Sequence, residues 1–296
     1  MATWRTGFET FHNQVAKTIQ GLPDKTSDPM CHAALNWRTM ESHYDVLTLM
    51  FLWRLMSLPA TCIYNQLFIK RITNVSSQVS SGVSYLKSPI HSMYHIADKY
   101  GMTQFVLDML ESGLICSKSK WQSTVEAAVK GMQTAKWHML CMMYKRVNLV
   151  YFPEPARLQW WFACKERPGL VKKCRILISL LAGELNLGCG KGRHIRRSSL
   201  CQLCEHYVEE TISHFLLECS GLQEARGTLL KELFAVMPPG MVHSLSSMTH
   251  SKQAEFLLCT MGRTHVAEWE AILVKVIDLV YGLYRARDDM LELLAV

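Results

Sequence analysis

Three cysteines and one histidine lie close together near residue 210, in the segment CQLCEHYVEETISHFLLEC. Cys201, Cys204, His214 and Cys219 follow the spacing C-x2-C-x9-H-x4-C. A C-x2-C turn directs two thiolates at one ion, and a His and a Cys from a following short helix complete a tetrahedron. We therefore expect one structural zinc ion, held by these four side chains, with no coordination position open to water.

The second half of this motif sets a condition on the local backbone. His214 and Cys219 are five positions apart, which on a regular helix means about 140° of rotation. The helix must therefore end or loosen near Cys219, and Gly221 just beyond permits that. His194 and His206 could replace His214, but each fits the spacing less well. The probability that this pattern arises by chance is about 1%. The alternative to a zinc site is three buried thiols beside a surface His.

The composition is that of a folded protein, because 49% of the 296 residues are hydrophobic and 19% are charged. The 11 cysteines are odd in number, so they cannot all pair, and they are too few for a disulfide scaffold. No basic-then-apolar leader is present, and the most apolar stretch, residues 46–53, is shorter than the roughly 20 residues of a membrane helix. We expect an intracellular protein with reduced thiols, nuclear or cytoplasmic, neither secreted nor bound to a membrane.

Positive charge is concentrated in the middle of the chain. Residues 136–200 contain 13 Lys and Arg against 3 acidic residues, a charge of +10, whereas the remainder carries −3. Such asymmetry favours contact with a nucleic acid or a membrane surface, and a solvated face is an equal alternative. The residues that we expect to meet RNA or DNA phosphates are Lys172, Lys173, Arg175, Lys191, Arg193, Arg196 and Arg197.

Helical periodicity dominates the rest of the sequence, and no strand alternation of useful length is found. The predicted fold class is mainly α, with helical bundle segments and a small CCHC zinc-binding module. Helices are expected to begin near Met40, at Ser88-Pro89 and at Lys118, and a short one from Thr103 ends near Gly113. The Ser- and Val-rich residues 73–87 indicate a linker.

These patterns divide the chain into four predicted segments. They are a loosely ordered part (1–39), a helical region (40–150), a basic segment with the zinc-binding module (151–226) and a C-terminal helical region (227–296). In the basic segment, Trp160 and Trp161 could stack on bases, but core packing is the favoured role. Cys31 and His32 also look like ligands, but they lack two further partners at metal spacing, so we interpret them as ordinary residues.

The segment around the four ligands resembles the zinc-binding region at the C-terminal end of non-LTR (LINE-type) retrotransposon reverse transcriptases. That family shows C-x-L-C, a Glu-Thr pair, H-x-L-x-x-C and then an Arg. The matching residues here are Cys201, Leu203, Cys204, Glu210, Thr211, His214, Leu216, Cys219 and Arg226. The match is specific over residues 175–226. It is looser around residues 44–72, within the region 40–150 that resembles the family's post-polymerase segment.

The resemblance does not extend to polymerase chemistry. Reverse transcription needs carboxylates for two metal ions, one of them from an aromatic-x-Asp-Asp turn, and the chain has no such motif. Its one Asp-Asp pair, Asp288-Asp289, lies in a helical pattern typical of a solvated face. The resemblance thus implies a non-catalytic, zinc-stabilised module that binds RNA or DNA and follows the polymerase domain of a longer parent protein. The alternatives are a zinc-stapled helical protein-interaction module and an inert transposon-derived fragment.

Overall fold

The computed structural model describes residues 2–81, 88–143, 160–188, 199–204, 207–258 and 267–294. Within these ranges the chain is mainly α-helical, as the sequence predicts, and β structure is limited to an isolated antiparallel bridge between Leu200 and Glu209. Among the helices in the same ranges, none combines the length and the apolar character that crossing a bilayer requires.

The chain forms two compact units, and two of the three boundaries between them along the sequence fall within helices. Unit 1 comprises Met1–Thr10 and Arg38–Lys136, and unit 2 comprises Phe11–Trp37 and Trp137–Val296. The four segments predicted from the sequence do not follow this division. Residues 11–37 share one hydrophobic core with the C-terminal half of the chain, and a local pattern along the sequence does not report such a long-range contact.

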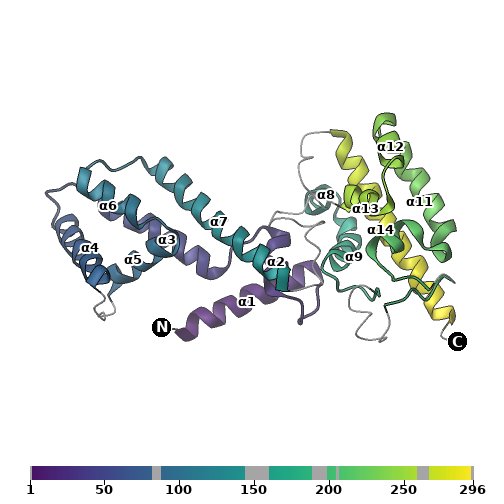
Figure 1. Ribbon diagram of the computed structural model, residues 1–296, viewed down its shortest axis with the longest axis horizontal. Helices are drawn as coiled ribbons and strands as arrows, with labels where there is room; N and C mark the ends of the chain where they lie inside the picture. Colours follow the sequence, from purple (N-terminus) through teal and green to yellow (C-terminus); the bar gives the residue numbers. More distant parts are fainter. Residues whose placement is uncertain are drawn as a thin grey trace. The chain divides into compact units, whose positions relative to one another are not determined.

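Unit 1 is a bundle around a core that contains Leu49, Trp121 and Val125, each with a fully buried side chain. The helices that contribute to it are α3 (Met40–Met56), α4 (Ile63–Ser81), α5 (Pro89–Lys99), α6 (Thr103–Ser112) and the first part of α7 (Lys118–Met143) (Figure 1). The Trp121 indole N–H donates to the Leu49 carbonyl at 3.0 Å, which satisfies the one polar atom of this buried ring.

Most of the helix limits in unit 1 follow from local sequence signals. Thr39 and Ser88 are the N-caps of α3 and α5, and each side-chain oxygen accepts a hydrogen bond from a backbone N–H three residues on. Gly113 ends α6 in the left-handed region, with φ 68°. The predicted linker is wrong up to Ser81, because Ile72 and Val75 continue the buried stripe of α4; residues 82–87 lie outside the described ranges.

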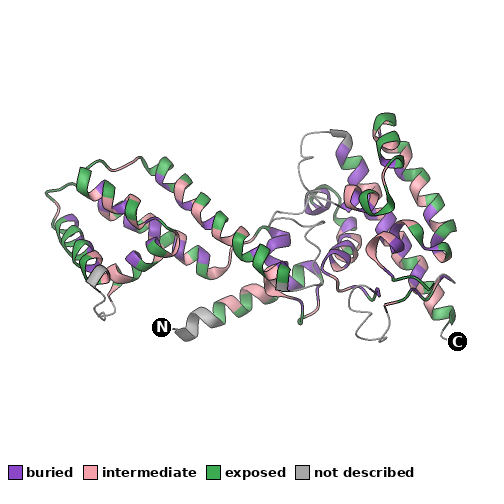
Figure 2. Ribbon diagram, viewed as in Figure 1, coloured by how far each residue is buried: buried purple, intermediate pink, exposed green. Residues whose placement is uncertain are grey.

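Unit 2 is built around α14 (Ala267–Leu294), which packs along α9 (Val171–Leu181) and α11 (Gln223–Val236) (Figure 1). Buried side chains recur along α14 at helical spacing, which gives the helix a continuous apolar face (Figure 2). The other α-helices of this unit in the described ranges are the latter part of α1 (Ala2–Gln20), α2 (Asp28–Leu35), the last part of α7, α8 (Trp160–Glu166), α12 (Pro239–Ser246) and α13 (His250–Leu258).

Two helices, α1 and α2, form in the N-terminal segment, whereas the sequence predicted that residues 1–39 are loosely ordered. In unit 2, α1 and α2 are joined by buried polar contacts. The fully buried Gln20 amide donates to the carbonyls of Ala16 and Cys31, at 3.0 and 2.9 Å. Lys17 pairs with Asp28 at 2.7 Å. The polar composition misled the prediction because these polar groups have their partners on the neighbouring helix.

Candidate metal centre

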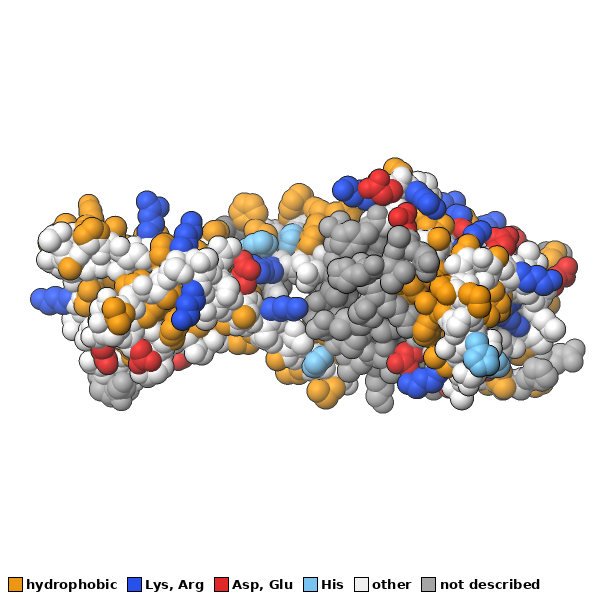
Figure 3. Space-filling view, turned by 90° about the horizontal axis from the view of Figure 1, so that it is seen from above, with side chains coloured by type: hydrophobic (Ala, Val, Ile, Leu, Met, Phe, Trp, Pro, Cys, Tyr) orange, Lys and Arg blue, Asp and Glu red, His pale blue; other side chains and the backbone are white. Residues whose placement is uncertain are grey.

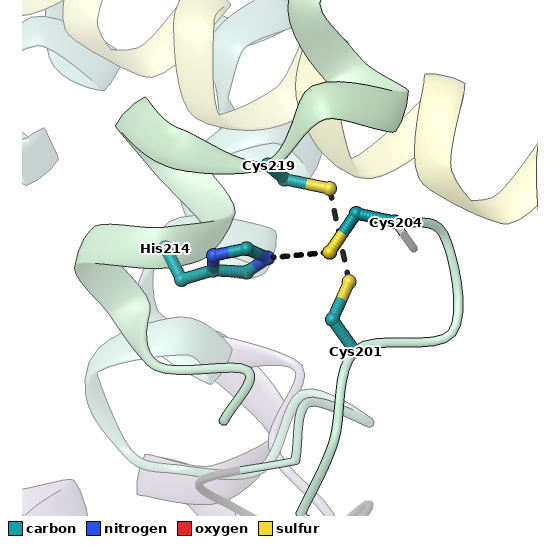
Figure 4. Close-up of side chains that lie close together, drawn as sticks. All are labelled: Cys201, Cys204, His214 and Cys219. Atoms are coloured by element: carbon teal, nitrogen blue, oxygen red, sulfur yellow. Dashed lines mark hydrogen bonds between the residues drawn. The ribbon is translucent and has the colours of Figure 1, made fainter. Parts of the chain in front are cut away.

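Cys201 and Cys204 are presented by a tight loop that begins directly after the β bridge. The bridge pairs Leu200 with Glu209, and the Cys201 N–H donates to the Val208 carbonyl at 2.9 Å. These backbone bonds fix the start of the loop, so that its two thiols point to the same side (Figure 4). This is the arrangement that the C-x2-C spacing predicts.

His214 and Cys219 come from the opposite side of the site, on a π-helical turn, η2 (His214–Glu218), and the residue after it. The Cys219 N–H donates to the His214 carbonyl at 2.8 Å, a bond between residues i and i+5. A turn closed in this way returns the chain to nearly the same side after five residues, which a regular α-helix would not do. The expected loosening of the helix before Cys219 is therefore confirmed, and the π-turn is its form.

The four side chains converge on one point with spacings that suit a tetrahedral ion. The sulfur atoms of Cys201 and Cys219 are 3.7 Å apart, and Cys204 sulfur lies 3.5 Å from His214 Nε2 (Figure 4). All four ligand atoms lie within 4.8 Å of one another. With metal–sulfur bonds of about 2.3 Å and metal–nitrogen bonds of about 2.0–2.1 Å, a tetrahedron has S···S edges of about 3.8 Å and S···N edges of about 3.6 Å. The cluster could thus hold a metal ion in the predicted ligand set.

The centre is buried and its thiols receive backbone hydrogen bonds. Cys201, Cys204, His214 and Cys219 have between 1% and 9% of their surface exposed. The hydrogen bond from Cys201 lowers the pKa of Cys219 to about 7, and the backbone N–H groups of Leu222 and Gly221 act in the same direction. The same bond and burial raise the pKa of Cys201 to about 12. Of the two thiols, Cys219 is therefore the one whose thiolate form its surroundings favour.

A buried guanidinium lies beside this anionic site. Arg226, on α11, is 7% exposed and its Nη2 donates to the Cys219 carbonyl at 2.6 Å. Burial lowers the pKa of Arg226, and the nearby Cys219 opposes that shift by favouring the charged form. A cation held here offsets the net charge of −1 that three thiolates and a divalent ion would carry.

Two neighbouring residues hold the His-bearing turn in place. The Thr211 hydroxyl accepts a hydrogen bond from the His214 N–H at 3.1 Å, which caps the turn. Glu210 is 2% exposed and forms a two-point ion pair with Arg287 of α14, at 2.7 and 3.1 Å. Glu210 also accepts the N–H of Gly188 at 2.8 Å, so that one carboxylate joins three separate parts of unit 2.

Gly221 allows the loop and the turn to pack closely. A Cβ at this position would collide with the Leu203 carbonyl, which lies between the first two cysteines. Gly188 is held in the same way, because a Cβ there would collide with the Ser199 carbonyl. Only glycine fits either position without movement of the backbone.

Three of the seven predicted phosphate contacts lie in the described part of the chain, on α9. Lys172 is exposed, but Lys173 pairs with Asp278 of α14 at 2.6 Å. Arg175 donates to the backbone carbonyls of Ile19 and Thr18, both at 3.2 Å. The other four predicted residues, Lys191, Arg193, Arg196 and Arg197, lie outside the described ranges.

Other sequence interpretations are confirmed. Trp160 and Trp161 are buried at 1% and 9% exposure, so core packing is their role. Asp288 and Asp289 lie on a solvated face of α14, where Arg285 pairs with both. The Glu210–Arg287 pair was not foreseen, since its members are 77 positions apart and no local pattern links them.

No family model, curated protein or solved structure matches this chain.

Proposed function

We propose that the chain is a zinc-stabilised module that binds RNA or DNA, with no catalytic role of its own. The observation that carries this proposal is the buried cluster of Cys201, Cys204, His214 and Cys219, whose spacings suit a tetrahedral ion. Zinc is the ion that three thiolates and one imidazole in tetrahedral geometry select. Four protein ligands leave no position for water or substrate, which makes the role structural.

The metal centre is coupled to the most basic run of the sequence. The ten residues between Gly188 and Ser199 include Lys191, Arg193, Arg196 and Arg197. Glu210 accepts the Gly188 N–H at 2.8 Å, and its own N–H donates to the Ser199 carbonyl at 2.8 Å. One residue therefore holds both ends of the basic run, and this residue lies six positions after Cys204 and four positions before His214. Zinc binding would thereby fix where these cations emerge from the fold.

The resemblance to LINE-type reverse transcriptases supports the same proposal. The shared Glu-Thr pair and Arg each have a structural task here. Glu210 binds Arg287, Thr211 caps the turn, and Arg226 contacts Cys219. In the proposal, the polymerase domain of a longer parent protein would perform the chemistry, and this module would bind nucleic acid.

Salt-dependent binding tests the proposal. Fluorescence anisotropy of labelled RNA and DNA with the purified chain should show log affinity falling against log salt with a slope of about −3 to −5, as for four to six phosphate contacts. Replacing Arg193, Arg196 and Arg197 together by Ala should flatten this slope by up to about 3. The matched control replaces the exposed lysines Lys118, Lys120 and Lys130 of α7 by Ala, and should leave the slope nearly unchanged. Indifference to the triple Arg substitution would count against the proposal.

A protein-interaction module is the second candidate, because unit 1 exposes large apolar side chains. Leu47 on α3 is 69% exposed, and Ile63 and Tyr64 on α4 are 58% and 69% exposed. Figure 3 shows hydrophobic side chains on the surface of this unit, at the left, among a few Lys and Arg. This candidate predicts weak nucleic-acid binding at low salt that is insensitive to the three arginines, so the same titration separates the two.

A further inference from the structure

A second pair of potential metal ligands lies in unit 2, on elements that the Cys/His centre does not use. His12 is on α1 and His32 is on α2, with ring centroids 4.7 Å apart in an edge-to-face arrangement. The ring of His12 also stacks on Trp37, at 5.1 Å and 9° between the planes. The orientation of His12 is thus fixed from two sides.

His32 is a buried polar group without a hydrogen bond. Its side chain is 5% exposed, and within the described part of the chain neither Nδ1 nor Nε2 has a hydrogen-bond partner. A neutral imidazole carries one N–H donor and one acceptor, and leaving both unsatisfied in the interior costs free energy. An unpaired buried ring of this kind calls for a partner that no described residue supplies.

His32 is in the chemical form that binds metals. Burial lowers its pKa to about 4, and the neighbouring His12 acts in the same direction. At neutral pH the ring is therefore uncharged, and no proton competes with a metal ion for its nitrogen.

The helices that carry the two rings are held together independently of them. Lys17 on α1 pairs with Asp28 on α2 at 2.7 Å, and the Asn13 amide donates to the other oxygen of the same carboxylate at 2.8 Å. The Gln20 amide donates to the Cys31 carbonyl. A site on two fixed helices requires little reorganisation when an ion binds.

We propose that His12 and His32 form a second metal site that takes a divalent transition-metal ion through its two imidazoles. Their ligand nitrogens lie within 4.8 Å of each other. Imidazole is a preferred ligand of zinc, copper and nickel, whereas it is a poor one for calcium and magnesium. The two imidazoles occupy two coordination positions of the ion, and water or an exogenous ligand completes the coordination.

Ni²⁺ titration of the 296-residue chain, with its Cys/His centre already loaded with one equivalent of Zn²⁺, tests the site. The background for all measurements is His91→Ala/His95→Ala, because the Nε2 atoms of these two histidines lie 3.1 Å apart and could themselves chelate Ni²⁺. Calorimetry should show one further equivalent of Ni²⁺ bound, and Ni²⁺ should raise the unfolding midpoint.

Two variants remove the ligands, and one serves as a control. His12→Phe keeps an aromatic ring on Trp37 while deleting the nitrogen, and His32→Gln deletes the buried imidazole. Each should weaken Ni²⁺ binding by at least about 10-fold and abolish the shift in midpoint. His243→Ala, at an exposed position of α12, should leave both unchanged. The absence of a further Ni²⁺ equivalent, or a folded His12→Phe chain that binds Ni²⁺ like its parent, would overturn the proposal.

Discussion

At the scale of single residues, Arg226 is a side chain outside the ligand set that supports the metal centre. It is buried against Cys219 and contributes a positive charge to a site that would otherwise be anionic. Arg226→Met should therefore weaken zinc binding by about 10- to 100-fold, as loss of a partner that supports a ligand does. Competition with a chromophoric chelator measures this. Lys231→Met, at an exposed position of the same helix, is the control, and an equal loss there would contradict the assignment.

Two glycines only six positions apart should respond to alanine in opposite directions. At Gly221 the added Cβ collides with the Leu203 carbonyl, so Gly221→Ala should lower the free energy of unfolding by about 1–3 kcal/mol. At Gly227, inside α11, the Cβ meets nothing within 4 Å, so Gly227→Ala should raise it by about 0.5–1 kcal/mol. Denaturant unfolding of the zinc-loaded chain measures both. If both substitutions changed the free energy of unfolding in the same direction, the inferred close packing at Gly221 would be contradicted.

At the scale of elements, the ion pair between Glu210 and Arg287 ties the metal-binding segment to α14. Both side chains are almost fully buried, at 2% and 4% exposure. Arg287→Met leaves the carboxylate buried without its cation and should lower the free energy of unfolding by about 3–5 kcal/mol. The control is Arg285→Met, whose exposed pairs with Asp288 and Asp289 should contribute less than about 1 kcal/mol.

The double variant Glu210→Gln/Arg287→Met distinguishes the ion pair from a general packing effect. Its loss of stability should be clearly smaller than the sum of the two single losses, because the second change removes the charge that the first leaves unpaired. Additive losses would mean that the two residues act separately.

The sequence predicted those parts of the fold and the site that depend on neighbours along the chain. The four ligands were found from their spacing, and the caps Thr39 and Ser88 and the stop at Gly113 match local signals. The contacts that the sequence did not predict join residues that are far apart along the chain. Arg287 has its partner 77 positions away, and Lys173 is paired 105 positions away with Asp278. Sequence charge alone cannot distinguish a lysine that faces solvent from one whose ion pair is distant.

At the scale of the whole molecule, removal of the metal should affect one unit and spare the other. The Cys/His centre lies entirely in unit 2, and the core of unit 1 contains none of its ligands. Because binding energy at a structural metal site stabilises the fold that forms it, chelation should destabilise unit 2. Hydrogen exchange read by mass spectrometry should show lost protection in η2 and α11 after chelation, and unchanged protection in α3 and α6. An equal loss of protection in both units would contradict the prediction that unit 1 keeps its stability without the metal.

The central claim is that Cys201, Cys204, His214 and Cys219 hold one zinc ion, and X-ray absorption at the zinc edge tests it most directly. The sample is the metal-free 296-residue chain reconstituted with one equivalent of Zn²⁺. The account predicts a first shell of three sulfurs at about 2.3 Å and one nitrogen at about 2.0–2.1 Å. In Cys219→Ser, one sulfur should be missing from that shell. A first shell of nitrogen and oxygen alone, or one that Cys219→Ser leaves unchanged, would contradict the account.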